Sequence, residues 1–180
     1  MNKTYLSTIA LGIGLVSGAA QTVHAEDTSK ESTASITVNP GSLSIKDVTN
    51  ITFPEYTIDG KDHNDLAEDS TNKSKVVVND FRSADTGWQM KAKIKEIRTI
   101  PGISLKFAPV LTENENHATV TPVTLNEEEQ VVASVDKEQI LSSELVTKFD
   151  LGATMDIPKN TKAGNYTATI VWSLEEVPNA

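Results

Sequence analysis

The fold is decided by the stretch that reads Trp88-Gln89-Met90-Lys91-Ala92-Lys93-Ile94-Lys95. Apolar and polar side chains alternate along it, which is the period of a strand that buries one face. The apolar face carries Trp88, Met90, Ala92 and Ile94, and the other face carries Gln89, Lys91, Lys93 and Lys95. The stretch therefore predicts a half-buried β-strand.

Other segments repeat this period and extend the prediction to most of the chain. Residues 103–107, 149–157 and 166–174 each place apolar side chains on one face, and Val76 begins a further strand. Thr, Val and Ile, which suit a pleated surface, are abundant. About eight to ten strands, with at most one short helix within residues 136–146, predict an all-β fold. The expected architecture is an antiparallel, immunoglobulin-like β-sandwich.

The region before these strands gives weaker signals. Residues 35–45 predict a hairpin around the turn Asn39-Pro40-Gly41. Residues 51–58 predict an edge strand, because Pro54 removes a backbone donor from any central ladder. Residues 59–74 are rich in Asp, Asn and Ser and predict a long polar loop.

The N-terminus predicts export. Residues 1–25 read as a secretory signal peptide, with Lys3, an apolar run at 9–16 and small residues near Ala25. Residues 26–33 predict a flexible polar tail, and residues 34–180 predict one folded domain. The apolar run is shorter than the ~20 residues that span a bilayer, and no later stretch approaches that length. We expect a secreted, extracellular protein that is not embedded in a membrane.

The charge balance excludes several kinds of partner. The 180 residues contain 16 Lys and Arg against 25 Asp and Glu, and removal of the signal peptide deletes one lysine and no acid. This acidity argues against binding to nucleic acid or to anionic lipid. The chain contains no cysteine, so stability must come from the core rather than from disulfides.

The sequence offers no catalytic motif and no clear metal site, so we expect neither an enzyme nor a cofactor. His63 and His117 have no neighbouring His or Cys, as a zinc site would require. The acidic segment Asp59–Asp69 supplies oxygen ligands, but its carboxylates are three residues apart with Lys61 between them. That spacing departs from the calcium-loop pattern and favours a solvated loop, with a calcium site left open.

Each tryptophan begins a triplet of the form Trp-x-apolar, namely Trp88-Gln89-Met90 and Trp172-Ser173-Leu174. Residues two apart in a strand point the same way, so each tryptophan shares a face with the apolar residue of its triplet. An indole ring suits either a core or a ligand platform. The in-phase apolar neighbours favour the core, and the platform remains the alternative.

Wider patterns surround the two triplets. The first triplet follows Val77-Val78-Asn79-Asp80-Phe81-Arg82 and Gly87. The second ends the run Ala163-Gly164-Asn165-Tyr166-Thr167-Ala168-Thr169-Ile170-Val171-Trp172-Ser173-Leu174, with Pro178 shortly after. Together they resemble the two half-motifs of the WxL domain of Gram-positive surface proteins, and the resemblance covers most of residues 35–180. Met90 stands where the family usually has Leu, and Ser83 replaces the usual Gly after Arg82.

The resemblance implies a small, single-domain WxL protein that associates non-covalently with the cell wall, with peptidoglycan or an associated wall polymer as ligand. The few residues after Leu174 contain no sorting motif, which fits a non-covalent attachment. The alternative is a protein–protein module that docks onto a membrane-anchored WxL-interacting partner. The candidate surface contacts are Gln89, Lys91, Lys93 and Tyr166, although a solvated outer face is the favoured interpretation of the lysines.

Overall fold

Alternating apolar and polar residues form twelve short β-strands and one 3₁₀ turn, Lys137–Gln139, in the part of the chain that the computed structural model describes. The described residues are 32–82, 86–95, 102–113, 118–140 and 145–177. The chain divides into two units, residues 1–37 and 38–180. In the first unit only residues 32–37 are described, and they form no strand. All twelve strands belong to the second unit.

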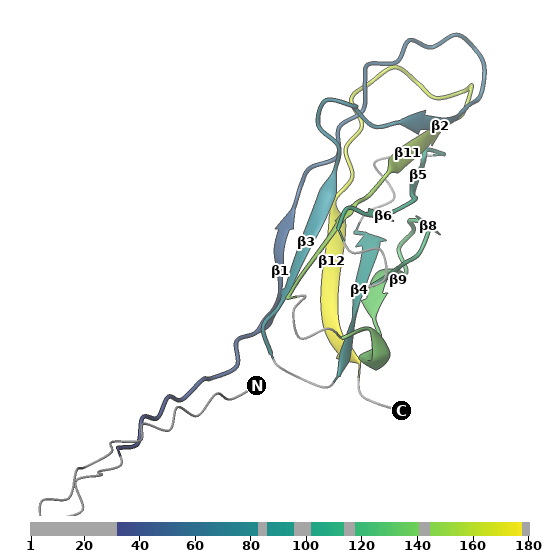
Figure 1. The fold of residues 1–180 in the computed structure, drawn as a ribbon. Coiled ribbons are helices and arrows are strands. Elements are labelled where there is room, and N and C mark those ends of the chain that lie inside the picture. Colours follow the sequence, from purple (N-terminus) through teal and green to yellow (C-terminus); the bar gives the residue numbers. More distant parts are fainter. Residues whose placement is uncertain (1–31, 83–85, 96–101, 114–117, 141–144, 178–180) are drawn as a thin grey trace, which may run out of the picture. The chain divides into compact units, whose positions relative to one another are not determined.

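The strands form three antiparallel sheets of four strands each (Figure 1). The first sheet has the order β1 (Leu43–Val48), β3 (Lys75–Asp80), β10 (Val146–Asp150) and β6 (Val110–Leu111). The second, called the motif sheet below, has the order β12 (Ile170–Val177), β4 (Gly87–Ile94), β9 (Gln130–Val135) and β7 (Thr119–Val120). The third has the order β2 (His63–Ala67), β11 (Ala153–Ile157), β5 (Ser104–Phe107) and β8 (Val123–Thr124).

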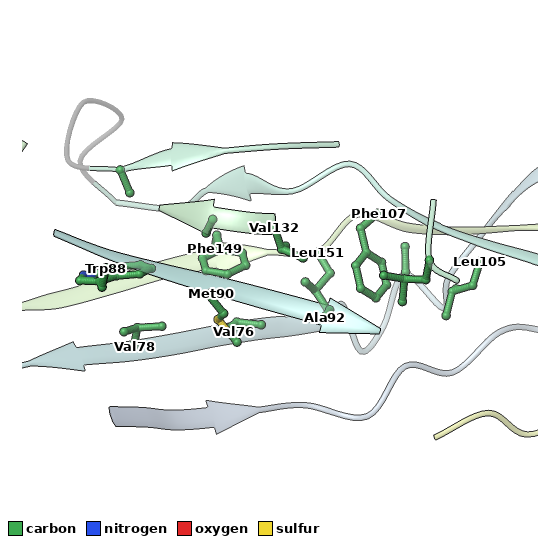
Figure 2. Packing of buried hydrophobic residues seen from close by; sticks show 14 of the residues in the cluster. Val76, Val78, Trp88, Met90, Ala92, Leu105, Phe107, Val132, Phe149 and Leu151 are labelled. Atoms are coloured by element: carbon green, nitrogen blue, oxygen red, sulfur yellow. The ribbon is translucent and has the colours of Figure 1, made fainter. Parts of the chain in front are cut away.

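One hydrophobic core joins the three sheets. The first sheet contributes Val76, Val78 and Phe149, and the motif sheet contributes Trp88 and Met90, all with at most 1% of their surface exposed. Figure 2 shows the buried side chains following one another along the core, from Trp88 at one end to Phe107 and Leu105 of β5 at the other. Inward alternation on facing sheets is the construction of a β-sandwich, so the predicted fold class is confirmed.

The continuous strand predicted over residues 149–157 is wrong in one respect. The chain pairs in the first sheet up to Asp150 and in the third sheet from Ala153 onward. Gly152 lies at the change, with a positive φ of 56°, and a Cβ atom there would stand 2.6 Å from the carbonyl oxygen of Ala108. A glycine therefore lets one alternating segment turn a corner and serve two sheets.

The weaker strand predictions near the N-terminus are also wrong. Residues 35–38 and 51–58 form no strand, and Ile36 and Val38 are 88% and 83% exposed. Conversely, the predicted polar loop contains β2, whose Leu66 and Ala67 pair with Met155 and Thr154 of β11. Backbone pairing with the open edge of β11 stabilises this strand, although its side chains lack an apolar period.

The C-terminal strand begins later than the alternating segment predicted for it. Residues 166–169 precede the first residue of β12, Ile170, and lie outside any strand. The other strong predictions, for β3, β4 and β5, are confirmed. The short 3₁₀ turn falls within the segment for which a short helix was predicted.

Candidate functional site

The two motif strands are direct neighbours in the motif sheet. In the register of β12 on β4, Trp172 lies opposite Ala92, and Leu174 lies opposite Met90. Directly opposed residues of an antiparallel pair project to the same face. Both Trp-x-apolar triplets therefore contribute to one inward face, although they are separated by most of the domain's sequence.

Trp88 lies in the core. Its side chain is 1% exposed, and Met90, in place of the usual Leu, is fully buried beside it. Figure 2 shows the indole ring at one end of the row of core side chains, near Val78. A ligand could reach this ring only if the sandwich opened, so burial favours the core interpretation of Trp88 over the platform.

Trp172 closes the core along the edge of the motif sheet. Trp172 and Leu174 are partly buried and pack against the core cluster. The ring of Trp172 stacks on Phe107 of β5, with 5.7 Å between the ring centroids and planes only 4° apart. This contact joins the motif sheet to the third sheet, and the partial exposure follows from the place of β12 at the sheet edge.

The outer face of β4 is neutralised by acidic side chains. Lys91 forms an ion pair with Glu175, which extends from β12, and the ammonium of Lys93 lies 3.1 Å from a carboxylate oxygen of Glu129. Gln89 lies opposite Glu175 in the register. Exposed pairs of this kind contribute about 0–1 kcal/mol each to stability. They nevertheless neutralise Lys91 and Lys93, the two lysines predicted as candidate surface contacts.

Tyr166 lies apart from these strands. Its side chain is 37% exposed, and its hydroxyl donates a hydrogen bond of 2.6 Å to the carbonyl oxygen of Lys162. The ring thus braces the turn before β12 and does not share the pleat of Trp172. The structure consequently does not bring the four candidate surface residues together in one cluster.

An arginine cluster that the sequence analysis missed ties strand ends together beside the motif sheet. Arg82 donates from Nε and Nη2 to the two carboxylate oxygens of Asp80, at 2.9 and 2.8 Å. Its Nη1 lies 3.4 Å from Glu176 of β12, and Nη2 donates to the carbonyl oxygen of Thr86. The hydrogen bond with Asp80 raises the pKa of Arg82. The Asp-x-Arg spacing is visible in the sequence, but the other two partners, Glu176 and Thr86, are not.

Carboxylates of the acidic segment are committed to internal contacts. Asp59 accepts hydrogen bonds from the Tyr56 hydroxyl at 2.9 Å, the Lys61 backbone N–H at 3.0 Å and the His63 ring at 2.9 Å. Asp65 lies 3.0 Å from the ammonium of Lys106. No three His, Cys, Asp or Glu side chains converge as metal ligands within the described ranges, while His117 lies outside them. These contacts stabilise the segment through its own residues, Lys61 and His63, and through Tyr56 and Lys106 outside it.

Acid titration of Asp59 is expected to have its midpoint near 2, because hydrogen bonds, first of all that from His63, lower its pKa from 3.8 to about 2. His63→Ala should move the midpoint upward. A pKa that is lower in the folded chain stabilises the fold above about pH 4, and this contribution is lost as the pH falls toward about 2. Carbon-detected NMR of the Asp59 carboxyl measures the midpoint.

Lys61→Ala is the matched control for this titration, since Lys61 donates through its backbone N–H and the variant keeps that donor. An unchanged midpoint in His63→Ala would show that the ring contact does not set the pKa.

Glu68 is a buried carboxylate that joins the loop before β3 to β11. It is 9% exposed, and its two oxygens accept hydrogen bonds from the backbone N–H groups of Ser74 at 2.9 Å and Ala153 at 3.2 Å. Its own N–H donates to the carbonyl oxygen of Ala153. The loop between β2 and β3 is therefore fastened to β11.

Glu68→Gln should destabilise the domain by about 2–3 kcal/mol, because the amide nitrogen would face a backbone donor that loses its acceptor. The melting temperature should fall by roughly 4–12 °C for a domain of this size. Differential scanning calorimetry measures the change. Glu127→Gln removes the same charge at an exposed residue and should leave the melting temperature almost unchanged. An equal fall of the melting temperature in both variants would refute the role of Glu68 in fastening the loop to β11.

The chain is thus an all-β domain built around two paired Trp-x-apolar strands. It belongs to the family of WxL domains, described as surface cell wall-binding, whose family model matches residues 20–178. No curated protein and no solved structure matches the chain. The resemblance drawn from the two half-motifs is confirmed, and the protein is a surface protein of a wall-binding family rather than of an enzyme family.

Among the described residues we find no helix that combines the length and the apolar character required to cross a membrane.

Proposed function

We propose that this protein is exported from a Gram-positive cell and holds non-covalently to the peptidoglycan of its wall. The observation that carries the proposal is the extent of the family match, since residues 20–178 include every strand that the structure describes. The sandwich itself is therefore the wall-binding unit. It acts by binding alone, without turnover of the polymer.

The geometry constrains how such binding works. Trp88 is buried and the partly buried Trp172 stacks on Phe107, so the motif tryptophans build the fold and the ligand contacts an outer surface. The formal charge of −9 disfavours a wall that is rich in anionic polymer. Binding therefore depends on local contacts at a few side chains rather than on net charge.

Sedimentation with purified sacculi tests the proposal. The folded chain is expected to pellet with sacculi at low salt and at physiological salt, and an unrelated acidic β-sandwich protein of similar size should stay in the supernatant. Turbidity of the sacculi should remain constant during incubation. A folded chain that stays wholly in the supernatant would overturn the proposal, and a falling turbidity would overturn the absence of catalysis.

The second candidate is docking onto a membrane-anchored WxL-interacting partner, and it is favoured by the edge position of β12 among the described strands. This strand of eight residues is an edge of the motif sheet, and open edges accept strands from partner proteins. Wall-free protoplasts that carry or lack the partner distinguish the candidates. Retention only where the partner is present would support docking, and equal retention would exclude it.

A further inference from the structure

A polar hollow lies where β1 ends and β3 begins. Its volume is about 630 Å³, within the range of ~300–1,000 Å³ that is usual for small-molecule sites. Three separate segments supply the lining: the residues after β1, the loop between β2 and β3, and the facing ends of β3 and β10. Every lining residue is of a polar or charged type, and hydroxyl, amide and ammonium groups come from Asn50, Thr52, Ser70, Asn72, Lys73 and Lys75.

These polar groups are not used by the fold. Within the described part of the chain, the side chains of Asn50, Ser70 and Asn72 form no hydrogen bond, and Lys73 and Lys75 form no ion pair. Lys91 and Lys93, by contrast, are both neutralised. Lys75 lies opposite Asp150 in the strand register, the single acidic residue among the described lining residues. The hollow thus carries two cations against one anion in an acidic chain.

The walls of the hollow are fixed by hydrogen bonds. Thr49 and Lys75 are joined by three hydrogen bonds. The Thr49 N–H and hydroxyl donate to the Lys75 carbonyl at 3.0 and 3.4 Å, and the Lys75 N–H donates to the Thr49 hydroxyl at 2.7 Å. The N–H of Asp69 donates to the Thr52 carbonyl at 2.8 Å, and both the N–H and the hydroxyl of Thr71 donate to the Asp69 carboxylate.

These contacts also lower the pKa of Asp69, chiefly through the Thr71 hydroxyl. Glu68 fixes the same loop, because its carboxylate accepts a hydrogen bond from the N–H of Ser74. A site whose walls are held in place before binding loses little conformational entropy when a ligand enters.

We propose that this hollow is the carbohydrate subsite of the wall-binding domain and takes an amide- and hydroxyl-bearing sugar unit whose anionic group lies between Lys73 and Lys75. The inference rests on the proposed wall binding and assigns that binding to this hollow. The anion has two sources in a wall, the carboxylates of peptidoglycan and the phosphates of a teichoic-type polymer, and both present the same chemistry to an ammonium pair.

The composition of the hollow favours such a ligand over an apolar one. As far as the structure describes the lining, it contains no aromatic ring and no large aliphatic side chain. Hydroxyl and amide groups without internal partners match the hydroxyl and N-acyl groups of amino sugars. The two lysines explain how an acidic domain can hold an anionic polymer, since charge-assisted hydrogen bonds act over short distances that the net charge does not govern.

Binding of the full chain to purified sacculi, measured as a dissociation constant by depletion from solution, tests the inference. The double variant Lys73→Ala/Lys75→Ala is expected to bind about tenfold or more weakly, as the loss of charge-assisted bonds implies. Lys61→Ala/Lys159→Ala removes the same charge at two lysines outside the hollow and should bind as the parent does. Asn72→Ala, which changes no charge, should weaken binding several-fold at every salt concentration.

The outcomes separate the inference from the function on which it rests. If the parent chain binds and both double variants bind equally well, the hollow is not the site and wall binding stands. If the parent chain fails to bind, both the proposed site and the proposed wall binding are refuted. Sacculi stripped of phosphate polymer by hydrofluoric acid identify the anion: lysine-dependent binding that survives stripping supports the carboxylate source, and lysine-dependent binding lost on stripping supports the phosphate source.

Discussion

Trp88→Ala is expected to lower the free energy of unfolding by about 3–5 kcal/mol, the usual loss when a fully buried aromatic side chain is truncated. The indole is 1% exposed, and its removal leaves a cavity between the first sheet and the motif sheet. The melting temperature should fall by roughly 6–20 °C. Chemical denaturation followed by circular dichroism measures the loss of stability.

Two further variants define what this loss means. Trp88→Phe keeps an aromatic ring in the site and should retain most of the stability. Trp172→Ala should cost less than Trp88→Ala, because Trp172 is partly exposed at the sheet edge and loses mainly its stacking on Phe107. A Trp88→Ala chain that melts like the parent but no longer binds sacculi would contradict the core assignment and restore the ligand platform.

Gly87→Ala is expected to destabilise the domain by about 3 kcal/mol, at the upper end of overpacking effects. A Cβ atom at residue 87 would stand 2.2 Å from the carbonyl oxygen of Val135 and 3.3 Å from the Cα of Asp136. The obstructing atoms are backbone, so no rotamer change relieves the contact. The ladder between β4 and β9 must separate next to Trp88, whose partner in the register is Val135.

Gly164→Ala is the matched control, since it makes the same change in the second half-motif. A Cβ atom there comes no closer than 3.8 Å to its nearest neighbours, which belong to the ring of Tyr166. We expect its melting temperature to stay within a few degrees of the parent value. Equal destabilisation by both substitutions, measured by calorimetry, would show that the approach of β9 to Gly87 does not matter.

The sequence predicted those parts of the fold in which local period and tertiary burial agree. In β4 every second residue from Trp88 to Ile94 is buried, as the alternation requires. In such segments the burial of a side chain is set by its position in its own strand, because the hydrophobic effect favours burying the apolar face of the strand.

Features that depend on partners distant in sequence could not be predicted. The strand β2 exists because β11 offers an open edge, and nothing in its polar residues indicates this. The neutralisation of Lys91 by Glu175 requires knowledge of the register between β4 and β12. The hollow gathers residues near 50, 72 and 150, three segments whose polar side chains look like ordinary loops when each is considered alone.

The pairing of β4 with β12 has a consequence for biogenesis. The two strands form eight register pairs, and each pair joins residues that lie far apart in the sequence. The pair of Gly87 with Val177 has the widest separation. Contacts of such long range form late, since a large loop must close before they form. If the chain is exported, as we propose, the sandwich cannot complete its fold until its last strand has left the translocation channel. The polypeptide would then remain unfolded enough to pass through the channel and would reach its final structure only outside the cell.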